Sequence, residues 1–137
     1  MNDRLIDTGI LIRYLRRSPR YREMLRDIGL EGYLYISTIS RLEVLRGLRE
    51  QEQKETFALL NNLSSIPVDC IIADQAGEFI HTWRKRGITL GDADALIAAT
   101  AVTLEIPLVT TNPRHFPMPE LVIWQAGESG DISLFER

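Results

Sequence analysis

The chain has 137 residues, of which 45% are hydrophobic and 26% charged, and its formal net charge at pH 7 is −3. These values are typical of one globular domain with a single core, so we expect residues 1–137 to form one domain with a C-terminal tail at 127–137. No apolar run reaches the roughly 18 residues of a membrane span, and the N-terminus does not resemble a signal peptide. The single cysteine excludes an internal disulfide framework, and the two histidines add too little for a typical zinc site. We therefore expect a cytoplasmic protein without a membrane partner.

The charges are unevenly distributed. The first fifty residues hold ten Lys and Arg against seven Asp and Glu, whereas the rest of the chain holds six against twelve. Six arginines fall between Arg13 and Arg26, and residues 84–86 form a second basic cluster. Such clusters are either solvated helix faces or phosphate-binding surfaces, and the sequence leaves both interpretations open.

Short apolar strands alternate with helices along the chain. In chain order, we predict a strand at 4–7, helices at 10–15 and 19–28, a strand at 33–36, helices through 39–48 and 51–63, an extended segment at 66–68, helices at 73–86 and 92–104, and strands at 107–110 and 121–124. Ser18 and Pro19 fit the N-cap and first position of the second helix, and Thr38 or Ser40 fits the cap of the third. The alternation indicates an α/β fold in which helices cover both faces of a central parallel sheet of about four to five strands.

The helix predicted at 92–104 is apolar on nearly every side, which indicates that it packs inside the domain. Its first turn nevertheless carries two carboxylates, Asp92 and Asp94. Asp92 fits the N-cap, where Asp is among the preferred residues. Asp94 is then a carboxylate within the first turn of a buried helix, and burial of an ionised carboxylate is costly without a compensating partner.

Three acids are expected to meet at one edge of the sheet. Asp7 follows the first strand, Asp94 opens the buried helix, and Glu43 lies on the third helix, whose start is near the sheet edge. Each has a structural alternative: Asp7 as a cap or turn residue, Glu43 as a surface residue paired with Arg46 or Arg41. Two carboxylates about 5 Å apart repel by roughly 3 kcal/mol at an effective dielectric near 20. A hard cation such as Mg²⁺ or Mn²⁺ relieves that repulsion and supports phosphoryl chemistry, but the residues alone do not identify the substrate.

Four segments in this order resemble the PIN-domain family, and within it the VapC-type toxins of toxin–antitoxin pairs. They are residues 5–11, 40–47, 94–101 and 109–116, and the likeness covers the chain from Leu5 to about Trp124. The resemblance implies a three-layer α/β/α PIN fold and a Mg²⁺- or Mn²⁺-dependent endoribonuclease, a hydrolase that cleaves RNA phosphodiesters. It also implies metal ligands at Asp7, Glu43 and Asp94, and a threonine at Thr110 that orients a ligand or the attacking water.

The chain departs from the family pattern at Asn112, where many PIN domains have a fourth acid. An amide oxygen can still contact a metal or its water, so Asn112 stays a candidate site residue. The sequence leaves open whether a second metal ion binds, with Asp92 as a partial substitute for the missing acid. His115 has two interpretations, a phosphate contact or a structural residue before Phe116, and we favour the structural one.

The resemblance further implies partners. RNA (tRNA, rRNA or mRNA) is the expected substrate, with phosphate contacts from Arg13, Arg16, Arg17 and Arg20. A cognate VapB-type antitoxin and a homodimer are also implied. An apolar groove for the antitoxin is predicted from Leu11, Ile12, Leu15, Leu42, Leu45 and Leu48, each of which has a core position as its alternative.

Two other functions are alternatives to the ribonuclease. A phosphoacceptor receiver domain needs paired acids after its first strand and a lysine at a later strand end, and this chain has neither. A degenerate PIN-like module that binds RNA or protein without cleavage stays open because of Asn112.

Overall fold

A computed structural model describes residues 2–137 and shows one six-stranded sheet in the order β3-β2-β1-β4-β5-β6. The strands are β1 (Arg4–Ile6), β2 (Leu34–Ser37), β3 (Ser64–Ile66), β4 (Leu108–Thr110), β5 (Ile123–Ala126) and β6 (Ile132–Leu134). The first five are parallel, and β6 pairs antiparallel with β5 at the edge of the sheet. The predicted α/β class with a mostly parallel central sheet is confirmed, with one strand more than the expected four to five.

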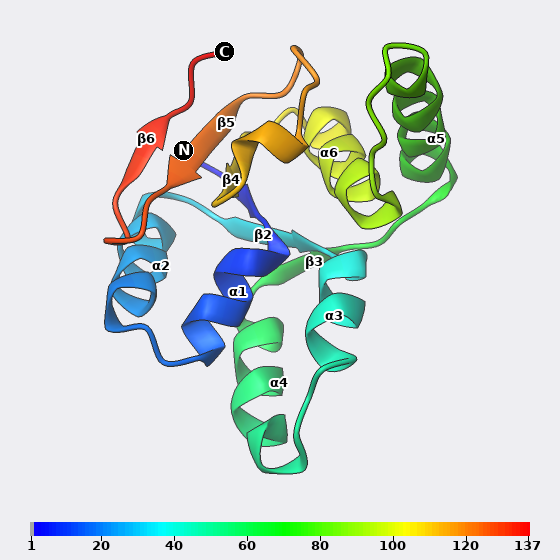
Figure 1. The fold of residues 1–137 in the computed structure, drawn as a ribbon. Coiled ribbons are helices and arrows are strands. Elements are labelled where there is room, and N and C mark those ends of the chain that lie inside the picture. The colour runs from blue at the N-terminus through cyan, green and yellow to red at the C-terminus, as the bar shows by residue number, and fades with distance from the viewer. Residues whose placement is uncertain (1) are drawn as a thin grey trace.

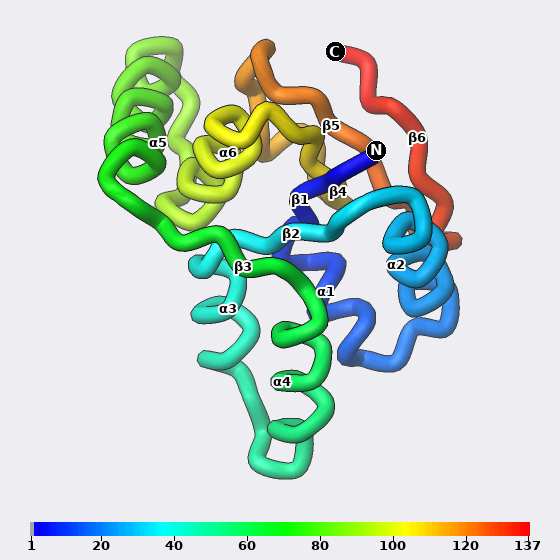
Figure 2. Tube along the Cα trace, turned by 180° about the vertical axis from the view of Figure 1, so that it is seen from behind, coloured from blue at the N-terminus to red at the C-terminus, as the bar shows by residue number. Residues whose placement is uncertain are grey.

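Helices cover both faces of this sheet, as Figures 1 and 2 show from opposite sides. They are α1 (Thr8–Leu15), α2 (Pro19–Glu31), α3 (Thr38–Leu45), α4 (Gln53–Asn62), α5 (Cys70–Arg84) and α6 (Asp92–Leu104), with short 3₁₀ turns η1 (Glu50–Glu52) and η2 (Pro113–His115). One core cluster lies between the sheet and α5 and α6, and a second lies between the sheet and α1, α2 and α4. Successive residues of β4 point to opposite faces of the sheet, so Leu108 packs in the first cluster and Val109 in the second.

The helix α6 is buried as its composition predicts. Residues 97–101 and Ala95 are all inaccessible or nearly so, because small side chains allow a helix to pack closely against both the sheet and a second helix, α5. Its N-cap residue is Gly91, so the prediction of Asp92 as the cap is wrong, and Asp92 is the first helical residue instead. The cap of α3 is likewise Ser37 rather than Thr38 or Ser40, whereas Ser18 caps α2 as expected.

The C-terminal tail is folded back onto the domain. The strand β6 pairs with β5, the backbone N–H of Phe135 donates to the carbonyl of Ile123 at 2.9 Å, and the phenol of Tyr21 donates to the carbonyl of Gly127 at 2.8 Å. Part of the predicted tail at 127–137 is thus the edge strand of the sheet.

Among the helices of residues 2–137, none has both the length and the apolar composition needed to cross a bilayer.

Candidate metal-binding acidic site

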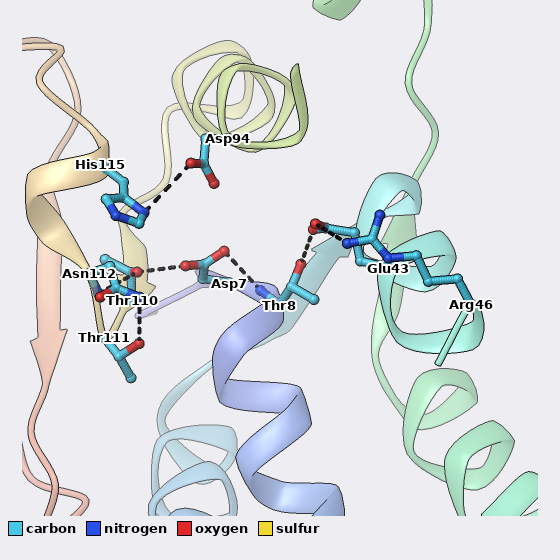
Figure 3. A network of polar contacts seen from close by, with 9 residues as sticks. All are labelled: Asp7, Thr8, Glu43, Arg46, Asp94, Thr110, Thr111, Asn112 and His115. Carbon is cyan, nitrogen blue, oxygen red and sulfur yellow. Dashed lines mark hydrogen bonds and ion pairs between the residues drawn. The ribbon is translucent and has the colours of Figure 1, made fainter. Parts of the chain in front are cut away.

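Asp7 lies at the carboxyl end of β1, where the chain turns directly into α1 (Figure 3). It is only 8% exposed, and its side chain has two donors: the backbone N–H of Thr8 at 2.9 Å and the hydroxyl of Thr110 at 2.6 Å. Asp7 is therefore also the N-cap of α1, as its structural alternative predicted. Burial raises the pKa of Asp7 from 3.8 to about 6, opposed by the two hydrogen bonds and reinforced by the charges of Asp94 and Glu43.

Glu43 approaches Asp7 from α3, and its two oxygens have different partners. The hydroxyl of Thr8 donates to Oε1 at 2.8 Å and also lies 2.8 Å from Oγ of Ser40. Oε2 lies 3.7 Å from the guanidinium of Arg46, one turn along the same helix. The predicted alternative of an Arg46 pair is thus present, while Arg41 instead bonds to the carbonyl of Leu60.

Asp94 faces the same place from the first turn of α6, with a side chain 34% exposed. Burial raises its pKa; His115 opposes that effect and Glu43 adds to it. Nδ1 of His115 lies 3.7 Å from Oδ2 of Asp94, and the histidine side chain is 60% exposed. His115 therefore lies at the surface of the site facing an acid, a position that leaves both of its predicted interpretations, phosphate contact and structural residue, in place.

The three acids come from three different elements and meet at the carboxyl end of β1, as Figure 3 shows. Their charges act on one another: Asp94 and Glu43 both raise the pKa of Asp7, and Glu43 raises that of Asp94. Within residues 2–137, however, no three His, Cys, Asp or Glu side chains are close enough to hold one metal ion between them. Magnesium commonly uses one or two carboxylates and keeps several waters, so a site with fewer than three direct protein ligands still fits that ion.

The donor set fits a hard cation in a second respect. In the described part of the chain Asp7 forms no ion pair, although it is buried beside two other acids. A buried carboxylate in that position is either protonated or compensated by a bound cation. Only oxygen atoms are offered by the acids, which favours Mg²⁺ or Mn²⁺ over softer metals.

Thr110 and Asn112 frame the site from the β4 side. Oγ1 of Thr110 donates to Asp7 and accepts the backbone N–H of Asn112 at 3.0 Å. The amide nitrogen of Asn112 donates to Oγ1 of Thr111 at 3.2 Å. Asp92 is exposed and is not among the charges that shift the pKa of Asp7 or Asp94.

Sequence reasoning gave no role to Thr8, whose hydroxyl donates to Glu43 and also lies beside Ser40. It named Ser40 only as a possible helix cap and Arg46 only as a surface partner of Glu43. Thr8 directly follows Asp7, and Ser40 and Arg46 lie one turn from Glu43, so each was within a recognised motif. What the sequence does not reveal is that α1 and α3 approach closely enough for residues 35 apart to form a hydrogen bond.

The predicted RNA-binding arginines lie around the far end of α1 and the start of α2. Arg16 and Arg20 are exposed, Arg13 stacks on the ring of Tyr21, and Arg17 lies 3.8 Å from Glu55. Arg22, which was not predicted to bind RNA, pairs with Glu55 and stacks on Tyr14.

A groove lies beside Glu43, between α1 and the segment that follows α3. Its volume is about 310 Å³, and its apolar walls are Ile12, Leu15, Val44 and Leu48, with Glu43, Arg16 and Arg49 at its rim. Of the predicted groove residues, Leu11 is instead fully buried in the core, and Leu42 and Leu45 do not line the groove.

Comparison with known proteins finds one family over most of the chain. The sequence profile of the PIN domain matches residues 4–119. Ribonuclease VapC10 of Mycobacterium tuberculosis is 36% identical over 116 residues, which cover 85% of this chain and 87% of that protein. Ribonuclease VapC1 of Methanocaldococcus jannaschii is 33% identical over 113 residues, covering 82% and 77%.

Solved structures share the fold. VapBC2 of Rickettsia felis, bound to a DNA fragment from its promoter, matches with a TM-score of 0.80 at 24% identity over 88% of this chain and 96% of that chain. A toxin–antitoxin complex from Klebsiella pneumoniae matches with a TM-score of 0.72 at 26% identity, covering 86% and 94%.

Proposed function

The chain belongs to the PIN domain family, and from that premise we propose that it is a metal-dependent endoribonuclease of the VapC type, the toxin of a toxin–antitoxin pair. The observation that carries the proposal is that Asp7 is buried at the carboxyl edge of the sheet within range of the charges of Asp94 and Glu43, with its pKa raised to about 6. Neighbouring carboxylates that lower the stability of the metal-free chain are expected where a bound cation belongs to the functional state.

We propose that Asp7 and Asp94 hold one Mg²⁺ or Mn²⁺ and that Glu43 reaches it directly or through water. The ion, when bound, polarises a phosphate oxygen and makes water a stronger nucleophile near neutral pH. The chain's own residues supply the orientation. The hydroxyl of Thr110 fixes one oxygen of Asp7, and Thr8 fixes one oxygen of Glu43. Both carboxylates are thereby held in defined directions before the substrate arrives.

Asn112 replaces a charge with an amide, so a second metal ion has one ligand fewer on this side of the site. We propose a single tightly held ion, with the Asn112 amide oxygen orienting water or substrate. His115 lies at the rim beside Asp94 and, as an exposed imidazole, is placed to contact a phosphate of the bound RNA.

Arg13, Arg16, Arg17 and Arg20 are proposed to contact RNA phosphates outside the acidic site. Single-stranded or loop RNA, whether from tRNA, rRNA or mRNA, is the expected target because its backbone bends and its bases are accessible. Residues 1–137 act as one domain in this proposal. A cytoplasmic location, where the RNA is found, is consistent with the single cysteine.

A cognate VapB-type antitoxin is the proposed inhibitor. The Rickettsia felis structure is of VapBC2, and the Klebsiella pneumoniae structure is of a toxin–antitoxin complex. The groove of Ile12, Leu15, Val44 and Leu48 borders Glu43, so a segment lying in it would also cover the acidic site. Amide hydrogen exchange should slow at this groove when the antitoxin is bound, and unchanged exchange there would refute the placement.

A homodimer is also proposed, and light scattering that gives the mass of one chain would refute it.

The decisive experiment is cleavage of a mixed RNA pool by the purified chain, with Mg²⁺ and with EDTA. Fragments are expected with Mg²⁺ alone, and Asp94→Asn should reduce their rate by at least about a hundredfold because one ligand charge is lost. Asp74→Asn is the matched control, since Asp74 is exposed on α5 and its variant should cleave as the wild type does. Fragments indifferent to EDTA and to Asp94→Asn would contradict the proposal.

The second candidate is a PIN-like module that binds RNA or protein without cleaving it, and Asn112 is the residue that favours it. Calorimetric titration with Mg²⁺ separates the two functions. An ion that binds the wild type but not Asp94→Asn supports the nuclease, whereas no binding to either chain supports the module.

A further inference from the structure

A second pocket lies directly beside the acidic site, between η2 and the β5–β6 hairpin. Its volume is about 340 Å³, within the range of small-ligand pockets. One wall is the segment 111–115 and the other is made by Gln125 of β5 and Phe135, which follows β6. The proposed cleavage chemistry gives roles to Asn112 and His115 on the first wall, but none to Gln125 or Phe135 on the second.

The pocket and the acidic site share part of their walls. His115 lines the pocket while its Nδ1 lies 3.7 Å from Asp94. Asn112 also lines it, and its backbone N–H donates to the same Thr110 hydroxyl that holds Asp7. Gln125 is the register partner of Thr110 on the neighbouring strand. A polymer whose phosphate sits at the acids therefore has an adjacent unit within reach of the pocket.

The chemistry of the lining matches a nucleobase. No acid lines the pocket, whereas Arg114 and His115 do, so an anionic backbone is not repelled there. Phe135 is half-buried and its backbone is fixed by the hydrogen bond to Ile123, so its ring offers an ordered apolar surface for stacking. The amides of Asn112 and Gln125 each carry both donors and an acceptor, as reading of a base edge requires.

We propose that this pocket binds one nucleobase next to the scissile phosphate and thereby sets the sequence preference of cleavage, with Phe135 stacking on the base and Gln125 reading its edge. The inference rests on the proposed ribonuclease function and names a specificity site within it. The family match ends at residue 119, so Gln125 and Phe135 lie beyond it. Two of the lining residues therefore belong to a part of the chain that the family profile does not describe.

The test is the sequence of the ends produced when the wild type and two variants cleave a randomised RNA pool with Mg²⁺. We expect the wild type to prefer a base at one position beside the cut. Gln125→Ala and Phe135→Leu should each reduce that preference about tenfold or more while leaving preferences at other positions unchanged. Leu134→Ala is the control, because Leu134 is exposed and does not line the pocket. Its preference should be that of the wild type.

Outcomes for the pocket and for the nuclease are separable. Folded variants that keep the wild-type base preference, or a wild type that cleaves without preference, would refute base recognition in the pocket. Either result would leave the proposed ribonuclease activity intact. If the wild type cleaves nothing, binding of short homopolymeric RNAs to Asp94→Asn, with and without Gln125→Ala or Phe135→Leu, still tests the pocket. Equal affinities with and without the pocket substitutions would overturn it. Should Phe135→Leu fail to fold by circular dichroism, Gln125→Ala alone decides.

Discussion

Asp7 combines three roles in one side chain. It caps α1 through the N–H of Thr8, accepts the hydroxyl of Thr110, and presents a charge to two other acids. The first two roles stabilise the fold and favour the ionised form, whereas burial disfavours it, and burial is the larger effect. Burial of Asp7 therefore lowers the stability of the metal-free chain, while its two hydrogen bonds fix the direction of the carboxylate that is proposed to bind the metal.

The pH dependence of stability follows from the raised pKa of Asp7. Between its unfolded value of 3.8 and about 6, the folded chain binds the proton more tightly, so its stability falls as pH rises through this window and stays reduced above it. The difference between the folded and unfolded pKa of Asp7 corresponds to a loss of stability of about 3 kcal/mol at most. Asp7→Asn avoids this loss but weakens one hydrogen bond, which costs about 1 kcal/mol. We expect Asp7→Asn in EDTA to be more stable than the wild type by about 2 kcal/mol at pH 7 and no more stable below pH 4.

Urea unfolding at several pH values measures this difference. Asp74→Asn, on the exposed surface of α5, should follow the wild type. Saturating Mg²⁺ should stabilise the wild type and leave Asp7→Asn unaffected, because only the wild type retains the ligand charge. An Asp7→Asn chain no more stable than the wild type at pH 7 in EDTA would show that burial of Asp7 carries no such cost.

The acids were predictable from sequence because each lies near a boundary between elements. Asp7 ends a strand and Asp94 begins a helix, and in parallel sheets such ends meet at one edge. The direction of each side chain was not predictable. That His115 faces Asp94 could not be read from the sequence, because its direction depends on how η2 crosses the end of the sheet, and no hydrophobic pattern in the sequence indicates that crossing.

At the scale of elements, helices with strong patterns were predicted and the last strand was not. The apolar run of α6 is unambiguous, whereas β6 is three residues of mixed polarity that become a strand only by pairing with β5. The hairpin that joins them depends on Gly130, whose φ is +80°. A Cβ at that residue would lie 2.8 Å from the carbonyl oxygen of Arg20 on α2.

Gly130→Ala should therefore destabilise the chain. The left-handed backbone costs a non-glycine residue about 1 kcal/mol or more, and the Cβ contact adds to it. We expect a loss of about 1–3 kcal/mol in the free energy of unfolding, measured by urea titration. Gly77→Ala is the control, because a Cβ there meets nothing within 4 Å and the residue lies within α5. That change should stabilise the chain by up to about 1 kcal/mol, and a neutral Gly130→Ala would show that the turn can relax.

At the scale of the whole molecule, the charge of −3 opposes RNA binding while the arginines around α1 and α2 favour it. We therefore expect the proposed RNA binding to use few phosphate contacts, and the basic cluster of residues 84–86 at the end of α5 offers a comparison. Arg16 lines the groove next to Glu43 and has no ion pair within the described residues. Arg84 is equally exposed, but lies at the C-terminal end of α5, which Figure 1 shows far from α1.

The salt dependence of RNA affinity therefore tests whether the bound RNA lies along α1 and α2 or along α5. For single-stranded RNA, each neutralised phosphate contributes about −0.7 to the slope of log affinity against log salt. In the Asp94→Asn background, which leaves the RNA intact, Arg16→Gln should make the slope shallower by about 0.7, and Arg84→Gln should leave it unchanged. Filter binding between about 50 and 200 mM salt measures both slopes. If Arg84→Gln changes the slope and Arg16→Gln does not, the RNA crosses the α5 side of the molecule, and the arginines of α1 and α2 are a solvated surface.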